Sequence, residues 1–181
     1  MRIIVYGTQY GSARRYAEEL AKMTSIDVRE HNEVDDINRY DTIIYIGSLY
    51  AGGVQGMKKT FAKLQNPADK NIVIATVGLA DPTVKEYTDT IKGEMQKQLS
   101  EETYEAANIF HLRGAIDYAK LGFKHKTMMA LLYRKCKGIP KEEQSADVKA
   151  LIETYNKQVD FVDFGSLQPI AQVVQGTIAE P

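Results

Sequence analysis

Runs of apolar, β-branched residues recur along the first 112 residues of the chain and alternate with longer segments of helical periodicity. Two of these runs, 41–47 and 70–78, are almost continuously apolar, which is typical of strands covered by other structure on both faces. A weaker segment at 26–31 alternates between apolar and polar positions and suits an edge strand. We therefore predict strands at residues 2–6, 26–31, 41–47, 70–78 and 107–112.

Amphipathic helical patterns separate and follow these strands. Residues 12–23 form one such pattern, with Ser12 as its expected N-cap. A second pattern covers 81–99 and opens with Asp81 as cap and Pro82 at the first helical position. Further helical patterns cover residues 53–64 and 145–164.

This order of strands and helices predicts an α/β domain. Strands that alternate with helices form a parallel sheet with helices on both faces. With five strands in the order 2-1-3-4-5, this is the flavodoxin-like doubly wound fold, whose ligands lie beyond the carboxyl ends of the strands where the strand order reverses. We expect one domain over residues 1–164, with a basic insertion at 113–141, and a C-terminal tail at 165–181.

The composition is that of an ordinary soluble protein, with 44% hydrophobic and 26% charged residues and a net charge of −1. The single cysteine, Cys136, cannot form an intramolecular disulfide, and we find no leader-like or bilayer-spanning apolar segment. We expect a cytoplasmic protein that rests at most on the inner face of the cell membrane. His31 and His125 have no neighbouring ligand pattern, and His111 lies within a predicted strand and is expected to pack there, so no metal site is expected.

The segment YGTQYGSAR, residues 6–14, joins the first strand to the first helix. Its backbone N–H groups and the hydroxyls of Thr8 and Ser12 would face a helix N-terminus, where unpaired donors and the helix dipole favour an anion. A tight strand-to-helix turn with a capping serine is the alternative. The segment has neither a GxGxxG motif nor a Gly-Lys-Ser/Thr ending, so neutral donors rather than a lysine would hold a phosphate here.

Two further loops follow the third and fourth strands. The loop LYAGGVQG begins at Leu49 and places Tyr50 among glycines, where an aromatic ring can stack on a planar ligand or pack on the adjacent helix. The loop TVGLADPT begins at Thr76 and occupies the corresponding position after the fourth strand. Because the carboxyl ends of parallel strands meet at one edge of a sheet, we expect the three loops to surround one ligand.

The loop GTQYGSA after the first strand resembles the phosphate-binding loop of the flavodoxin family. This resemblance implies that FMN is the cofactor, with its terminal phosphate at this loop. It also implies that the loops after the third and fourth strands flank the isoalloxazine, with Tyr50 stacking on the ring. The cofactor-binding residues implied are Thr8, Gln9, Tyr10, Gly11, Ser12, Ala13, Ser48, Leu49, Tyr50, Ala51, Gly52, Thr76, Val77 and Gly78.

Between Asp117 and Glu142 the chain carries seven Lys or Arg residues and no acidic residue. One interpretation is a solvated basic helix whose apolar stripe packs on the sheet. A second is a helix at an anionic membrane surface, where each basic residue contributes about 1 kcal/mol. A third is a site wall that faces the carboxylates of a large, partly apolar substrate. Nucleic acid is not an expected partner, because the patch is short and no base-reading module is present. The apolar stripe consists of Met128, Met129, Leu132, Tyr133 and Cys136.

The segment from Phe110 to Tyr155 resembles the corresponding region of menaquinone-dependent protoporphyrinogen dehydrogenases of the flavodoxin superfamily. The resemblance implies oxidation of protoporphyrinogen IX or a similar substrate by bound FMN, with electrons passed to a quinone, and membrane or substrate contact through residues 120–137. It implies catalytic roles for Arg113, which would stabilise a reduced flavin or a substrate carboxylate, and for Tyr118, which would cover the pocket. Three more residues would lie beside the flavin: Gly114, Ala115 and Asp117.

Other functions are compatible with the same fold and must be compared with a flavin-dependent dehydrogenase. An electron carrier without its own substrate turnover is the main alternative, although carriers usually present an acidic surface around the flavin, and residues 118–141 are basic. A receiver-type signalling domain fails because the first strand ends in Gly7-Thr8-Gln9, with no acidic pair for a metal. The expected partner is a quinone or a redox protein. For Arg113, an ion pair with Asp117 is the structural alternative to a catalytic role.

Overall fold

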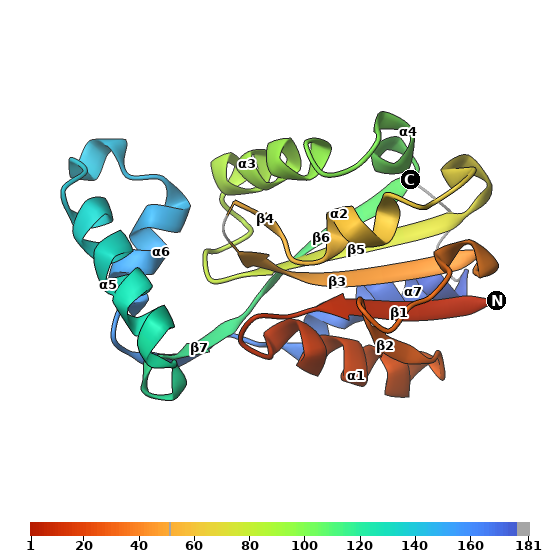
Figure 1. Ribbon diagram of the computed structural model, residues 1–181, viewed down its shortest axis with the longest axis horizontal. Helices are drawn as coiled ribbons and strands as arrows, with labels where there is room; N and C mark the ends of the chain where they lie inside the picture. Colours follow the sequence, from red (N-terminus) through yellow and green to blue (C-terminus); the bar gives the residue numbers. More distant parts are fainter. Residues whose placement is uncertain (51, 177–181) are drawn as a thin grey trace.

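The computed structural model describes residues 1–50 and 52–176 of the chain, so Ala51, one of the cofactor contacts implied above, lies outside the described residues. The main sheet has five parallel strands in the order β2-β1-β3-β5-β6 (Figure 1). A short strand β4 (Gly53–Val54) pairs antiparallel with the end of β3. The predicted α/β fold and strand order are therefore confirmed. The strands of the parallel sheet are β1 (Arg2–Gly7), β2 (Val28–Glu30), β3 (Thr42–Tyr50), β5 (Asn71–Gly78) and β6 (Ala107–Arg113).

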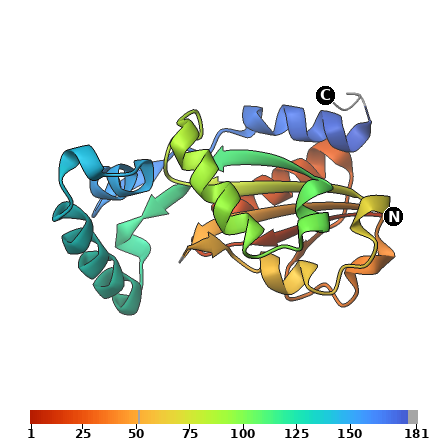
Figure 2. The same ribbon diagram turned by 90° about the horizontal axis from the view of Figure 1, so that it is seen from above.

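Two helical layers cover the sheet, one on each face (Figure 2). Successive residues of a strand point to opposite faces, so Ile43 and Ile44 enter different cores. Ile44 packs with residues of α1 (Ser12–Thr24) and α7 (Gln168–Gln175), whereas Ile43 packs with residues of α2 (Met57–Phe61) and α3 (Lys85–Gln96). Burial on both faces explains why the central strands are almost continuously apolar.

Helix α7 overturns the expectation of a tail for the described part of that segment, residues 165–176. Leu167 and Ile170 are fully buried, and Ala171 and Val174 are nearly so, against the same core cluster as α1. The helix has only eight residues, with Pro169 in its first turn and Gly165 shortly before it, so its local signal is weak. Its buried stripe nevertheless has helical spacing, and packing on the sheet stabilises it.

A projecting unit, residues 118–157, stands beyond the carboxyl end of β6, and we call it the cap (Figure 1). It lies between β7 (Ala115–Asp117) and β8 (Gln158–Asp160), which pair antiparallel with each other. The predicted helix at 145–164 is too long, because α6 ends before Tyr155 and Asn156 adopts a left-handed conformation with φ of 58°. The insertion thus extends past residue 141. The cap contains α5 (Phe123–Lys137) and α6 (Ala146–Thr154).

Two predicted helix starts also need correction. The side chain of Asp81 accepts hydrogen bonds from the backbone N–H and hydroxyl of Thr83, which makes a turn, and α3 begins only at Lys85. Helix α1 begins at Ser12 as predicted, but Gly11 occupies the N-cap position. A short helix α4 (Glu101–Glu105) precedes β6 and was not predicted. Within residues 1–50 and 52–176, the structure contains no helix with the length and apolar character needed to cross a membrane.

Candidate functional site

The loops that follow β1, β3 and β5 meet at one end of the sheet. The hydroxyl oxygens of Thr8 and Ser48 are 3.5 Å apart, which joins the first loop to β3. The rings of Tyr10 and Tyr50 meet edge to face with centroids 6.4 Å apart. The three loops therefore surround one region, as the parallel topology requires.

The loop after β1 ends in a helix N-terminus. Gly11 has a φ of 92°, a conformation that favours glycine, and its N–H donates to the hydroxyl of Thr8 at 3.0 Å. The first N–H groups of α1 have no acceptor within the helix, so this position favours an anion. The hydroxyl of Ser12 is fixed elsewhere, because it accepts from the N–H of Ala115 at 2.8 Å. Ala13 is fully buried and offers only its backbone.

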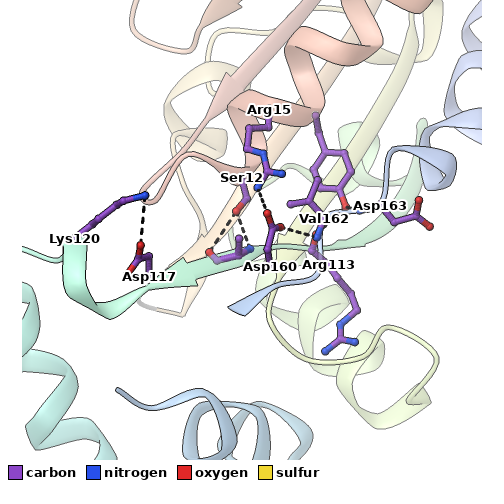
Figure 3. Close-up of polar contacts among 10 residues, drawn as sticks. Ser12, Arg15, Arg113, Asp117, Lys120, Asp160, Val162 and Asp163 are labelled. Carbon is purple, nitrogen blue, oxygen red and sulfur yellow. Dashed lines mark hydrogen bonds and ion pairs between the residues drawn. The ribbon is translucent and has the colours of Figure 1, made fainter. Parts of the chain in front are cut away.

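A cavity of about 400 Å³ adjoins this loop and reaches β7 and β8. Its lining includes two cations, Arg15 and Lys120, which the sequence analysis did not place here. Each is paired with a carboxylate, Arg15 with Asp160 at 2.9 Å and Lys120 with Asp117 at 3.4 Å (Figure 3). Both cations are thus already paired with carboxylates, and the expectation that neutral donors would hold a phosphate at this loop stays a prediction.

A larger cavity of about 510 Å³ lies between the ends of β3 and β5 and the cap. Its size is within the range of roughly 300–1,000 Å³ that small-molecule sites occupy. Gly78 is required at its floor, because a Cβ at this position would lie 2.0 Å from the hydroxyl oxygen of Tyr87. The sheet side of the lining includes Leu49, Tyr50, Gly52, Gly78 and Leu79, and the cap side includes Tyr118, Met129, Leu132, Asp147 and Leu151.

Two buried tyrosine hydroxyls lie at this end of the sheet. The hydroxyl oxygens of Tyr10 and Tyr118 have no hydrogen-bond partner within the described part of the chain. Burial raises the pKa of both phenols, and the pKa of Tyr118 reaches about 12, with Tyr10 as the next cause. An unsatisfied buried hydroxyl costs about 1–3 kcal/mol, so a ligand that bonded these groups would recover that energy.

Two of the implied cofactor contacts lie inside the domain. The side chain of Thr76 is 1% exposed, and its hydroxyl is 2.8 Å from Nδ1 of His111. Val77 belongs to the core cluster on the α1 side. Only Gly78 and the residues after it reach the cavity, because the two preceding residues are covered by packed elements.

Arg113 lies beside the loop after β5 and does not line the larger cavity. Its guanidinium donates to the carbonyl oxygen of Leu79 at 3.0 Å and lies 3.8 Å from the centre of the Phe161 ring. It does not pair with Asp117, whose carboxylate pairs with Lys120. Arg113 therefore positions the loop after β5, whereas Tyr118 lines the cavity as expected.

The cap closes over the loops through the first two turns of α5. Nε2 of His125 is 3.1 Å from Nε2 of Gln9, and its ring meets Tyr10 edge to face. The hydroxyl of Tyr50 lies 3.9 Å from the sulfur of Met128. These contacts join positions more than 75 residues apart in the chain, and the sequence analysis predicted neither of them.

The charges in the larger cavity are acidic. Its charged lining residues are Glu94 and Asp147, and no Lys, Arg or His from residues 1–50 and 52–176 lines it. All the basic residues of α5 are exposed. The interpretation of the basic segment as a wall that faces substrate carboxylates is therefore wrong for this cavity. The apolar stripe of α5 is also divided, with Met129 and Cys136 buried and Leu132 partly exposed.

A family model described as flavodoxin domain matches residues 3–143. No curated protein matches the chain. Among solved structures, a mutant flavodoxin from Pseudomonas aeruginosa is 17% identical, with 84% of this chain and 99% of that chain covered and a TM-score of 0.42. A flavodoxin from Fusobacterium nucleatum bound to flavin mononucleotide is 13% identical, with 68% and 74% covered and a TM-score of 0.40. At these values the structural likeness carries no conclusion about ligands.

Proposed function

The chain belongs to the flavodoxin domain family, and we propose that it is an FMN-dependent oxidoreductase. FMN is the cofactor, bound at the carboxyl ends of β1, β3 and β5. The observation that carries the proposal is that the loops after β3 and β5 line a cavity of about 510 Å³, while the loop after β1, which contacts them through Thr8–Ser48 and Tyr10–Tyr50, leads into α1 and lines a second cavity. A planar apolar ring suits the cavity, and a phosphate suits the helix N-terminus.

The residues at both places fit the two ends of FMN. The backbone of Thr8 to Ala13 would hold the phosphate, and the adjoining cavity is lined by Arg15 and Lys120, each paired with a carboxylate. Tyr50, Gly52 and Gly78 would contact the ring. The unpartnered hydroxyl of Tyr118, which lines the same cavity, would bond one of its polar atoms.

Bound FMN supplies the redox chemistry by accepting electrons from one reactant and passing them to another. The protein orients the ring and excludes water from it. Met129 and Leu151, which belong to the cap, close the cavity on the side away from the sheet. Arg113 acts through the carbonyl of Leu79 and holds the loop that borders the ring.

We propose protoporphyrinogen IX or a similar reduced substrate as the electron donor and a quinone as the acceptor. The support for this part is the resemblance of residues 110–155 to the protoporphyrinogen dehydrogenases and the presence of a cap over the cavity. Because cations lie only outside the larger cavity, the carboxylates of such a substrate would remain at the rim. An electron carrier without substrate turnover is the alternative, favoured by the match to the flavodoxin domain itself.

The outer face of α5 is proposed to contact an anionic membrane surface, which would place the protein at the inner face of the cell membrane. Phe123 is 87% exposed and Leu131 is 62% exposed on a helix with exposed lysines. Apolar side chains with flanking cations suit the boundary between lipid headgroups and acyl chains.

The deciding experiment is an absorption titration of the purified protein with FMN, followed by anaerobic addition of protoporphyrinogen IX and then a menaquinone analogue. Bleaching of the flavin by the substrate and recovery with the quinone support the dehydrogenase. FMN binding without bleaching supports the carrier. Absence of FMN binding overturns the proposed function.

A further inference from the structure

Helix α5 of the cap contacts two of the loops that follow the strands. Nε2 of His125 lies 3.1 Å from Nε2 of Gln9, and the His125 and Tyr10 rings meet edge to face with centroids 6.0 Å apart. Three residues further along α5, the sulfur of Met128 lies 3.9 Å from the hydroxyl of Tyr50. Positions three apart share one face of a helix. One face of α5 therefore bridges the loop after β1 and the loop after β3.

The contact between His125 and Gln9 has a defined direction. An amide nitrogen donates and cannot accept, so Nε2 of His125 is the acceptor. Gln9, Tyr10 and His125 are all partly buried. The hydrogen bond and the aromatic pair together hold the loop after β1 from the cap side, and the backbone of this loop is the one that would bind the phosphate of FMN.

The cap is held to the body by a limited set of contacts. It is joined to the body through β7 and β8, which have three residues each and pair with each other. Helix α6 adds Ala146 and Ala150, which pack against the core cluster on the α3 side. A unit with few buried apolar contacts opens at a lower free energy than the core. When the cap opens, His125 leaves Gln9.

The larger cavity has walls from both parts of the molecule. Tyr50 and Gly78 line it from the body, and Met129 and Leu132 line it from the cap. A ligand in this cavity contacts both walls only when the cap is closed, so it binds the closed state more tightly than the open state. Coupling of this kind is reciprocal, so closure of the cap must raise the affinity for the ligand by the same factor by which the ligand favours closure.

We propose that His125 is a positioning residue for FMN, which couples closure of the cap to binding of the cofactor. It acts through Gln9 and Tyr10, which belong to the loop that would hold the phosphate. The inference rests on the proposed function, because FMN is the ligand whose binding is coupled to the cap. In this arrangement FMN holds the cap closed, and the closed cap slows the release of FMN.

The first test measures hydrogen exchange of the α5 amides by mass spectrometry, with and without saturating FMN. In the wild type, FMN should slow this exchange by at least about tenfold. In His125→Ala, the protection that FMN gives should fall by about fivefold or more, because the hydrogen bond and the ring contact are lost together. The control is Leu131→Ala, which removes a side chain that is 62% exposed on the same helix and should keep the wild-type protection.

The second test times the release of radiolabelled FMN from the protein in an excess of unlabelled FMN. His125→Ala should release FMN about tenfold faster than the wild type. His125→Gln restores an acceptor for the Gln9 amide and should stay within about threefold of the wild type. In a Gln9→Ala background, His125→Ala should accelerate release by less than about threefold, because part of the interaction is already absent.

The two measurements together distinguish positioning of the cofactor from general support of the helix. Equal acceleration of α5 exchange in His125→Ala with and without FMN would overturn the inference, since it would mean that His125 only stabilises the cap. Wild-type exchange that FMN does not change, or release from His125→Ala at the wild-type rate, would also overturn it. In these cases FMN still binds and the proposed function stands. If the wild type binds no FMN, the proposed function falls first and the inference with it.

Discussion

The sheet body and the cap are stabilised in different ways. In the body, strand residues such as Ile43, Ile44 and Ile72 are fully buried in two large clusters. In the cap region, the cluster has four buried members: Ile116, Tyr118, Leu121 and Met129. Elements with few buried apolar contacts open at a lower free energy than the core they lie on.

This difference separates two tasks of the molecule. The body supplies the ends of the strands and the helix N-terminus, which form the proposed FMN site. The cap supplies the far wall of the cavity, against which the proposed second reactant would lie. A weakly held cap can also open for that reactant, while the cofactor site stays folded.

The largest expected effect is on the stability of the body. Ile44→Ala should lower the free energy of unfolding by about 2–5 kcal/mol, because the cavity it leaves is enclosed between β1, β5 and α1. Met129→Ala in the cap should lower global stability by less than half as much, because the cap can open before the body unfolds. Urea denaturation measures both. Equal losses would show that the two regions unfold as one unit.

Gly78→Ala should damage the site more than the fold. A Cβ there would lie 2.0 Å from the Tyr87 hydroxyl and 2.8 Å from Cδ1 of Leu49, so the loop must shift. We expect FMN affinity to fall by about tenfold or more and stability by about 1–3 kcal/mol. The control is Gly93→Ala in α3, where no atom lies within 4 Å and the helix should gain about 0.5–1 kcal/mol. If Gly78→Ala binds FMN as tightly as the wild type does, Gly78 does not contact the cofactor.

Replacing Phe123 and Leu131 together by serine should weaken binding to anionic vesicles by about tenfold, because both exposed apolar side chains would be lost from the lipid interface. Co-sedimentation with vesicles of phosphatidylglycerol and phosphatidylcholine measures this, with pure phosphatidylcholine as the uncharged reference. Val84→Ser removes an exposed apolar side chain from the body and should have no effect. If the wild-type protein does not co-sediment with anionic vesicles, the membrane proposal is contradicted.

The smallest effect is a gain in stability. Burial raises the folded-state pKa of Asp147 above its ordinary value of 3.8, so the ionised carboxyl destabilises the fold when the pH is above the folded-state pKa. Asp147→Asn should therefore stabilise the protein at about pH 7 by less than ~1 kcal/mol, since solvent screens this exposed side chain. Below the ordinary value both states bind the proton, and the gain should vanish. Thermal unfolding at about pH 7 and about pH 3 checks the sign. A loss of stability near pH 7 would mean that the carboxylate has a stabilising partner.

The local sequence predicted most of the body. Strands β1, β3 and β5 were recognised within about three residues at each end, because central parallel strands must be apolar on both faces. Gly11 and Gly52 were expected in the loops at these strand ends, and both adopt positive φ. The strand periodicity and the loop glycines depend only on residues close in the sequence, so the sequence predicts them.

Only the tertiary structure decided the rest of the site. The sequence analysis treated α7 as a tail, because its burial depends on α1 and the sheet rather than on its own eight residues. The contact of His125 with Gln9 joins residues 116 positions apart, and no local sequence pattern near either residue predicts it. Leu151 lies on a helix that the sequence predicts, but only the fold of the cap brings it to the wall of the larger cavity. The sequence by itself thus determined the sheet and the loops at its edge, because local periodicity and turn chemistry specify them. The cap, the cavity and its charge arise from contacts between distant segments, which exist only once the chain has folded.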